Sequence, residues 1–391
     1  MTLISGAVGT NSLGTGTRKY DHSDELYSVD PNFAVLAFFA RKLKKKGVTD
    51  PEYRWFDKAL PSRYDAVNYS TNYTSGATSV VVDDGTKFRI GDIVMDITTG
   101  EHLYVDGVST NTLTVVRGEG TTSAGTLTDN DVLVIIGNAN AEGAGLRTAL
   151  ASQKTKRTNY TQIFREPFNV TETLASSETY AGKDEMAQNR KDALEVTMRD
   201  IERSFFFGEA KEDLSTETQP LRTTAGLRSF VSSNVSNVTS LNSGTVTEAI
   251  FEDWISDMFT NGGDKKMGFL SMLIGSAVNS WAKNKLQMFP KDKTYGVAIS
   301  NYLSIHGELN FVIEKLFAEN STFNGYAFGV DMNLIGYRFL NGNGKSRDIK
   351  LLKNRQDNGD DEQIEEYLGE IGFWLALENR HGFMKGVTAY A

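Results

Sequence analysis

The sequence predicts an α+β fold that carries a small all-β domain as an insertion. The first observation is a segment, 69–138, in which apolar and polar residues alternate between closely spaced turn dipeptides, without any helical period. The second is the longest helical pattern of the chain, 184–210, which directly follows a strand pattern. A chain of 391 residues with 39% hydrophobic and 23% charged residues can bury more than one core of a globular protein.

Composition excludes several classes of function. The chain has no cysteine, so disulfides, thiolate metal sites and a cysteine nucleophile are ruled out. Its net charge of −9 lacks the basic excess expected of a dedicated nucleic-acid binder. The longest apolar run, 33–40, is too short to cross a bilayer. The first sixteen residues do not have the pattern of a signal peptide.

The N-terminal region predicts an extended arm followed by a short helix. Residues 1–30 are rich in Gly, Ser and Thr and show no sustained period. We expect a helix from about Pro31 to Lys46, with Gly47 as its stop. The basic cluster Lys42–Lys46 fits the negative end of that helix dipole, and a contact with DNA or an acidic neighbour is the alternative.

Next come an aromatic cluster and the inserted domain. Between Pro51 and Pro61 and just beyond lie four aromatic residues: Tyr53, Trp55, Phe56 and Tyr64. In 69–138, turn dipeptides such as Asp84-Gly85 and Asp106-Gly107 separate short alternating runs. Many short strands without helices predict a small β-barrel or sandwich.

The strand and long helix that follow are the clearest elements of the chain. Apolar residues of the strand are Tyr160, Ile163, Phe164, Phe168 and Val170. In the helix, one stripe of 3.6-residue period runs through Ala187, Leu194, Met198, Ile201 and Phe205. Asp184 and Glu185 suit its start and Gly208 its end. Roughly 26 residues at 1.5 Å each predict a rod of about 40 Å, which suits a structural strut.

The C-terminal half predicts two more helices and several strands. We expect helices over 246–259 and 267–286 and strands within 302–316 and 325–352. Residues 356–366 are expected to form an acidic loop. Near the C-terminal end we predict a buried strand in which Ile371, Phe373, Leu375 and Leu377 point one way.

No catalytic, cofactor-binding or metal-ligating residue is predicted. The string Asn341–Ser346 ends like a phosphate-binding loop, but Phe339 stands where that motif needs a glycine, so we predict a hairpin turn. Four histidines lie far apart in the sequence without metal-site spacing: His22, His102, His306 and His381. His381 is expected to be structural. The acidic residues Asp357, Asp360, Asp361 and Glu362 do not match a calcium loop.

The order of these motifs resembles that of the major capsid proteins of tailed bacteriophages, which have the HK97 fold. The resemblance rests on NYTQIF, VTET, the Asp-Glu helix start, DIERSFFFG and LRTTAGLRSFV. Within that family the chain is similar to the branch with a β-rich insertion in the extended loop, through FRIGDIV, TGEHLYV and NTLTVVRGEGTT.

The resemblance implies a division of the chain into the parts of that fold. Those parts are an N-terminal arm (1–30), a short helix and rising arm of the extended loop (31–68), the inserted β domain (69–138), the descending arm (139–181), the spine helix and peripheral domain (182–225), the axial domain (226–340) and the C-terminal strands of the peripheral domain (341–391).

The implied function is self-assembly into an icosahedral shell that encloses double-stranded DNA. Implied partners are copies of the chain in hexamers and pentamers, a portal, a scaffolding protein and a decoration protein on the insertion. Packaged DNA would be met only through weak non-specific contacts, and no membrane is implied. The location would be the virion, after assembly in the host cytoplasm. Two alternatives stay open here: a glycan-binding or glycan-cleaving protein with a β module, and an encapsulin-like compartment shell.

Overall fold

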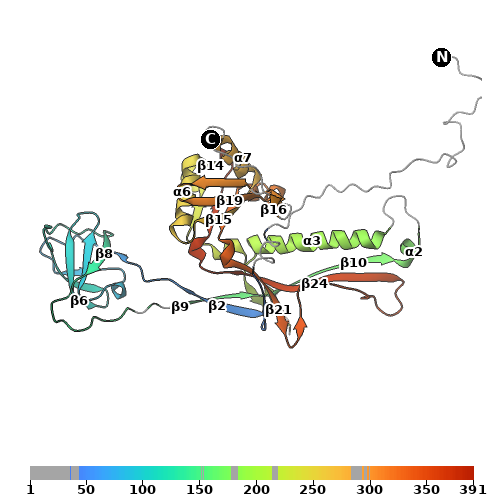
Figure 1. Cartoon of the computed structure of the whole chain (residues 1–391), viewed down its shortest axis with the longest axis horizontal. Coiled ribbons are helices and arrows are strands. Elements are labelled where there is room, and N and C mark those ends of the chain that lie inside the picture. Colours follow the sequence, from blue (N-terminus) through green and yellow to red (C-terminus); the bar gives the residue numbers. More distant parts are fainter. Residues whose placement is uncertain are drawn as a thin grey trace, which may run out of the picture. The chain divides into compact units, whose positions relative to one another are not determined.

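The computed structural model divides the chain into two compact units (Figure 1). The barrel unit is Phe56–Lys156, and the core unit comprises Met1–Trp55 and Arg157–Ala391. The structure describes Leu36 and residues 44–150, 152, 154–177, 184–213, 219–282, 293–294, 297–298 and 300–391. The predicted arm, 1–30, lies outside these residues.

The barrel unit is one six-stranded sheet that closes on itself. Its strands, in spatial order, are β3 (Tyr64–Ala66), β8 (Val132–Asn138), β5 (Asp92–Asp96), β6 (His102–Ser109), β7 (Thr112–Val116) and β4 (Ser79–Val81). A bridge between Val67 and Val82 joins the two edge strands, and the Asp83 N–H donates to the Ala66 carbonyl at 3.1 Å. Aliphatic side chains fill the interior, with Phe88 as the only fully buried aromatic of that cluster. A single-turn 3₁₀ helix, η1 (Gly85–Lys87), precedes β5.

The barrel begins earlier in the chain than the sequence pattern indicates. The resemblance placed Tyr64 in the rising arm, whereas β3 pairs with β8 inside the barrel. The physical reason is Asp65, which is buried at an inward position and pairs with Lys87 at 2.6 Å. An acidic residue at an inward position hides the alternation on which the prediction depends.

Two extended strands connect the units. β2 (Glu52–Lys58) pairs with β9 (Lys154–Tyr160). Immediately after Thr161 the chain continues as β10 (Gln162–Thr171), which belongs to the core unit.

The first sheet of the core unit carries the long helix. Its strands run in the order β1 (Lys45–Val48), β21 (Ile335–Gly342), β24 (Glu362–Leu375) and β10, with β22 (Lys345–Ser346) beside β21 and β23 (Lys350–Leu352) beside β24. β10 and β24 are antiparallel over ten residue pairs. The short helix α2 (Glu172–Ala175) follows β10, and α3 (Glu185–Phe207) lies along the β10–β24 pair (Figure 1).

Strand β1 corrects the predicted N-terminal helix. That helix was expected to extend to Lys46, but Lys45–Val48 pairs in parallel with Tyr337–Leu340 of β21. Of residues 31–43 only Leu36 is described, and it is helical. A backbone ladder to a strand almost 300 residues away is a long-range contact, so local propensity could not reveal it.

Helix α3 has the predicted ends and a partly different buried face. The Asp184 carboxylate accepts from the Ala187 N–H at 2.9 Å, and a Cβ at Gly208 would come within 2.3 Å of the Thr224 carbonyl oxygen. Ile201 and Phe205 are buried as predicted, whereas Ala187 and Leu194 are exposed. The small residues Ala193 and Thr197 are buried instead. The buried face of the helix includes Met186, Ala193, Thr197, Ile201 and Phe205.

The second sheet of the core unit shares a hydrophobic core with two helices. Its order is β13 (Val235–Asn237), β25 (Gly382–Lys385), β20 (Ala327–Val330), β15 (Lys265–Leu270), β19 (Gly307–Ile313) and β18 (Ser300–Ser304). Helices α6 (Glu248–Thr260) and α7 (Met272–Ala282) pack their apolar residues into the same core. Short elements complete the unit: α4 (Leu227–Phe230), α5 (Val238–Asn242), β11 (Lys211–Asp213) with β12 (Leu221–Thr223), β14 (Thr245–Val246) with β26 (Ala389–Tyr390), β16 (Lys293–Thr294) with β17 (Val297–Ala298), and the 3₁₀ turns η2 (Lys315–Glu319), η3 (Phe323–Gly325), η4 (Met332–Leu334) and η5 (Glu378–Arg380).

Three further predictions for the core unit are corrected. The first residues of the predicted helix 267–286 belong to strand β15, because a short, fully buried apolar run has no distinguishing period. The predicted acidic loop 356–366 becomes strand β24 from Glu362 onward. Leu377 was expected in the same buried strand as Leu375, but it lies beyond the end of β24, in the left-handed region with φ 53°.

Aromatic side chains dominate the interior around the end of α3. The ring of Phe206 lies 5.0 Å from that of Phe317, 5.2 Å from that of Phe328 and 5.6 Å from that of Phe269. Such edge-on and tilted pairs contribute about 1 kcal/mol each beyond the area that they bury. This cluster joins the long helix to both sheets of the core unit. Among the described helices, none has the length and apolar character needed to cross a membrane.

Candidate functional site

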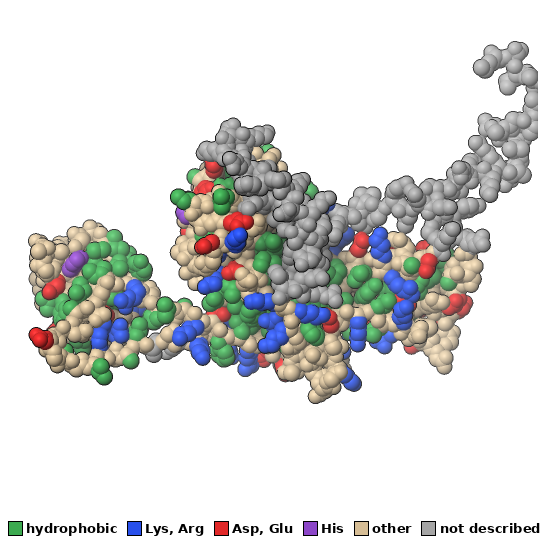
Figure 2. Space-filling view, in the orientation of Figure 1, with side chains coloured by type: hydrophobic (Ala, Val, Ile, Leu, Met, Phe, Trp, Pro, Cys, Tyr) green, Lys and Arg blue, Asp and Glu red, His purple; other side chains and the backbone are tan. Residues whose placement is uncertain are grey.

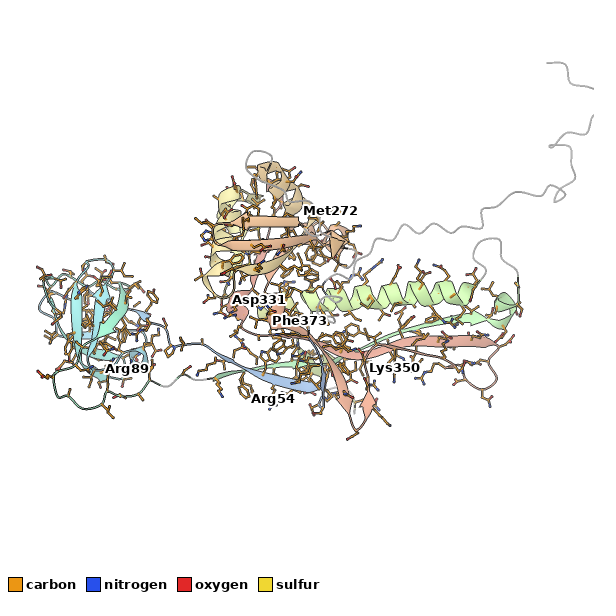
Figure 3. The ribbon with its side chains drawn as sticks, viewed as in Figure 1. Arg54, Arg89, Met272, Asp331, Lys350 and Phe373 are labelled. Atoms are coloured by element: carbon orange, nitrogen blue, oxygen red, sulfur yellow. The ribbon has the colours of Figure 1, made fainter. Side chains whose placement is uncertain are left out.

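The candidate site is a buried polar cluster at the root of the two extended strands, which we call the strand anchor. It consists of Tyr53 from β2, Asn159 from β9, Thr224 from the segment between β12 and α4, and the backbone of Phe373 in β24. All belong to the core unit, where Figure 3 labels Phe373.

Asn159 is the centre of the strand anchor. Its side chain is fully buried, and Nδ2 donates to the Phe373 carbonyl at 2.7 Å and to Thr224 Oγ1 and the Ala225 carbonyl at 3.1 Å each. Oδ1 accepts from the Ala225 N–H and the Tyr160 N–H at 2.8 Å. One amide therefore ties β9 to both β24 and the segment that follows the long helix.

Tyr53 and Thr224 complete the cluster. The Tyr53 hydroxyl donates to the Phe373 carbonyl at 2.5 Å, and Thr224 Oγ1 accepts from the Phe373 N–H at 3.1 Å. A Cβ at Gly372 would lie 2.5 Å from the Tyr53 hydroxyl, so only glycine leaves room for this contact. Burial raises the pKa of Tyr53 far above its usual value, which keeps the donating proton in place.

Paired charges fasten the far part of β24 on both of its faces. Glu365 receives two bonds from Arg190 of α3, at 2.6 and 2.7 Å. On the other face, Glu366 accepts from Arg165 of β10 at 2.5 Å and from Arg355 at 2.8 Å. The bond from Arg190 lowers the pKa of Glu365. Burial alone would raise the pKa of Glu366, but the two arginines hold it below its usual value. Both carboxylates are therefore charged at neutral pH.

The long helix also holds the N-terminal segment. Oε1 of Glu202, in α3, accepts from the backbone N–H of Leu36 at 2.7 Å, and both residues are fully buried. Leu36 belongs to the aromatic-rich core around α3. The helix thus fixes the position of Leu36.

A third polar cluster lies where α6, β15 and η5 meet. Lys266 Nζ donates to the carbonyls of Met258, Asn261 and Arg380 at 2.8, 3.2 and 2.6 Å. His381 Nδ1 accepts from the Asp331 N–H at 3.3 Å, so Nε2 carries the proton and donates to the Ala376 carbonyl at 3.2 Å. Burial lowers the pKa of His381 to about 4 and that of Lys266 to about 8. His381 therefore has the structural environment expected from the sequence.

The other residues singled out in the sequence do not come together. Asn341–Ser346 is a hairpin turn as predicted, with Asn343 and Gly344 at φ 52° and 72°. His102, His306 and His381 lie in β6, in the β18–β19 turn and after η5, and His22 is outside the described residues. Among the residues that the structure describes, no group of three or more His, Asp or Glu could hold a metal ion. Asp357, Asp360 and Asp361 are exposed.

Pattern analysis missed Asn159, Thr224 and Glu202. Asn159 falls in a strand pattern where a single amide carries no signal. Glu202 could have been found, because it stands one turn beyond Met198 on the face of α3 that the stripe assigns to the core. An acidic residue at a core position predicts a buried partner.

Comparisons with known proteins agree with this architecture. A family model described as SU10 major capsid protein matches residues 8–388. The major capsid protein of Pseudomonas phage PaMx41 is 25% identical over 293 residues, which cover 73% of this chain and 69% of the relative. The capsid of a native GTA particle superposes with a TM-score of 0.51 at 9% identity, over 98% of this chain and all of that one. The capsid protein of cyanophage P-SCSP1u gives 0.51 at 8% identity, over 97% and 96%. The predicted α+β fold of the HK97 type is confirmed.

Proposed function

The chain belongs to the SU10 major capsid protein family and is a major capsid protein of a tailed phage. We propose that two parts of it build the shell: the core unit, which forms a rigid plate, and the extended strand pair β2–β9, which contacts neighbouring subunits. A shell is built from many copies of this chain in capsomers, and the virion is where it acts. The function is therefore that of a shell protein and not of the glycan-binding or glycan-cleaving alternative.

The proposed assignment follows the resemblance. The resemblance gives 182–225 and 341–391 as the peripheral domain, with α3 as its spine, and 226–340 as the axial domain. Strand β21 (Ile335–Gly342) belongs to the first sheet and β25 (Gly382–Lys385) to the second, so we propose that each crosses these bounds.

The resemblance gives 31–68 and 139–181 as the arms of the extended loop and 69–138 as the domain inserted in it. Because β3 (Tyr64–Ala66) pairs inside the barrel and β10 (Gln162–Thr171) pairs in the first sheet of the core unit, we propose that the inserted domain begins at β3 and that the second arm ends before β10. Support comes from the β10–β24 pair beneath α3, and from β2 and β9, which connect the barrel unit to the core unit.

The strand anchor is the observation that carries this proposal. An extended strand pair can contribute to a shell only if the end that joins the core unit stays in place when a neighbouring subunit binds along the strands. Asn159 and Tyr53 fix that root with buried hydrogen bonds to β24, and Arg190 fixes β24 to the spine. Buried polar networks of this kind are stabilising when every member is satisfied and costly when one is removed.

Further partners belong to the proposal. We propose that the chain forms hexamers and pentamers, assembles in the host cytoplasm, and meets a portal and a scaffolding protein there. A decoration protein would bind on the inserted domain. Packaged DNA would be met by weak, non-specific contacts, since the chain is acidic overall. No catalytic step is proposed, since the family is one of structural proteins.

Expression and imaging test the proposal. The full chain, produced alone and together with the other head proteins of its phage, should give closed particles of megadalton mass in sedimentation and negative-stain microscopy. Asn159→Ala should reduce particle yield strongly. The matched variant Asn169→Ala should not, because Asn169 is exposed on β10 and its side chain donates to Glu362. Subunits that never assemble in either setting would overturn the proposed shell building. Equal yields from the two variants would remove the anchor from it.

A further inference from the structure

The outer surface of the barrel unit has an apolar face on three adjacent strands. Its outward residues are Tyr64 on β3, Val132, Val134 and Ile136 on β8, and Met95 with the following Ile97 on β5. The register places Tyr64, Val134 and Met95 side by side, and the Ile97 N–H donates to the Val132 carbonyl. We call these six residues the apolar face.

The opposite side of the same barrel is mixed where it faces outward. On β4 and β7, Ser79 lies directly opposite Thr114, and both are exposed, whereas Val81 is half-buried and Val116 is 49% exposed. On the apolar face, Tyr64 is 58% exposed, Ile97 54% and Ile136 48%. Figure 2 shows hydrophobic side chains gathered over much of the barrel surface. The outward side chains of the apolar face are not needed to fill the interior of the barrel, and they adjoin one another on three neighbouring strands. A contiguous exposed apolar patch of this kind marks a binding surface.

We propose that the apolar face pairs with the same face of a second copy of this chain within the shell, so that two barrels pack back to back. This proposal rests on the shell-building function and adds the surface and its partner. None of the six residues is charged, so the face offers nothing to a charged ligand, and an uncharged apolar face matches it best. A second copy of the chain has the same apolar face, and a contact of two-fold symmetry would bring the two faces together.

The size of the face favours a second copy over a separate soluble protein. It consists of six partly exposed side chains, which is small beside the 800 Å² or so that each partner gives to a stable pair. A free protein would bind such a face weakly. Copies of this chain in a shell are already held together by their other contacts, which raises their effective concentration, and a small face is then sufficient.

A cross-linking experiment tests the pairing directly. The chain has no cysteine, so a single introduced thiol is the only one present. Val132→Cys and Ile136→Cys place it on the apolar face, and Thr114→Cys is the matched control on the opposite side of the barrel. Disulfides require Cα atoms within about 7 Å, so mild oxidation should join subunits only where the faces meet. Assembled particles of at least one face variant should give covalent dimers, several-fold above the control.

Charge substitutions give a second, independent measurement. The double variant Ile97→Glu/Ile136→Glu should leave the circular-dichroism spectrum of the subunit unchanged, since both side chains point outward, but lower the yield or melting temperature of the particles. Thr114→Glu should do neither. The proposal is overturned if particles form but neither face cysteine cross-links above the control. Protection of the face cysteines from alkylation without cross-linking also overturns it, because a different surface then covers them. Absence of particles from the unmodified chain would instead count against shell building itself.

Discussion

The barrel unit and the core unit are built on opposite plans. The barrel is one continuous stretch of chain, 56–156, so all of its strand pairings stay within that stretch, and its interior is almost entirely aliphatic. The core unit depends on pairings between distant segments, such as β1 with β21 and β13 with β25, and its main interior is rich in phenylalanine. A domain whose contacts all lie within one stretch of chain can be inserted without disturbing the rest of the fold. In the core unit, by contrast, distant segments depend on one another for their pairing.

The two units also differ in their buried ionisable groups. In the barrel, Glu101 and Arg117 are both deeply buried and paired at 2.7 Å, and burial, which would raise the pKa of Glu101, is outweighed by the bonds from Arg117 and two backbone N–H groups. The core unit holds buried groups that lack such a partner. His381 has its pKa lowered to about 4, and burial raises the pKa of Glu314 to about 8. The core unit should therefore respond to pH more than the barrel does.

The largest expected effect lies in the core unit. Ile201→Asp places a charge where the native side chain is fully buried beside Phe205, and we expect a loss of about 4 kcal/mol or more in the free energy of unfolding. Leu194→Asp, on the exposed side of the same helix, is the matched control and should change it by less than about 1 kcal/mol. Thermal melting of soluble subunits measures both. Equal melting temperatures would refute the assignment of the buried face of α3.

A comparable change confined to the barrel should follow from Glu101→Gln. It leaves the Arg117 guanidinium buried without its counter-charge, which costs about 3–5 kcal/mol. Arg117→Met in the same chain should recover part of that loss, because no unpaired charge remains. Hydrogen exchange followed by residue should show the change within 56–156 alone. If the amides around α3 lose protection equally, the two units do not behave as separate parts.

Acid should weaken the core unit through His381. The imidazole has a pKa of 6.5 when exposed and about 4 in the fold, so the unfolded state binds the proton more readily between these values. Stability contributed by the neutral ring is complete above pH 6.5 and is lost as pH falls to 4, by about 3 kcal/mol. Lys266 opposes protonation, whereas Asp331 and Glu378 favour it. His381→Gln should flatten this part of the stability–pH curve, and a curve that keeps its slope would contradict the assignment.

Glu314 should act in the other direction, since its pKa is raised. The folded state holds its proton up to about pH 8, so the stability it contributes is present at acidic pH and declines as pH rises from 4.5 through 8. Glu314→Gln, which keeps the acceptor for the Leu316 N–H, should remove that decline. Chemical denaturation at a series of pH values measures it. An unchanged alkaline limb in this variant would show that another group is responsible.

The smallest effect is expected from removing the barrel. Replacing residues 63–138 with a short Gly/Ser linker should leave the melting temperature of the core unit within a few degrees of that of the full chain, because the two units have separate interiors. A linker across 69–138 only would leave β3 without its partner β8, and should give a less soluble product. Loss of soluble protein from both versions would argue that the barrel supports the core.

The sequence could predict what short-range pattern determines. The ends of α3, the turn at Asn343-Gly344 and the alternating strands of the barrel all follow from residues within one or two turns of each other. Strand β1 could not be predicted, because its partner is almost 300 residues away. Glu365 and Glu366 suggested a solvated loop because their arginine partners come from α3, β10 and the segment after β23. The strand anchor was missed for the same reason, because the role of Asn159 depends on its hydrogen bonds to Thr224 and Phe373, which are distant in the sequence.

The continuous run from β9 into β10 has a mechanical consequence. Asn159 stands just before the point where the chain stops pairing with β2 and starts pairing with β24. A pull along β9 is therefore transmitted first to the strand anchor and then to a ladder of ten residue pairs oriented along the pull. Ladder hydrogen bonds are perpendicular to the strands, so such a load shears them together and does not open them one after another. The force that the attachment of the strand pair withstands should therefore grow with the number of residue pairs in the β10–β24 ladder.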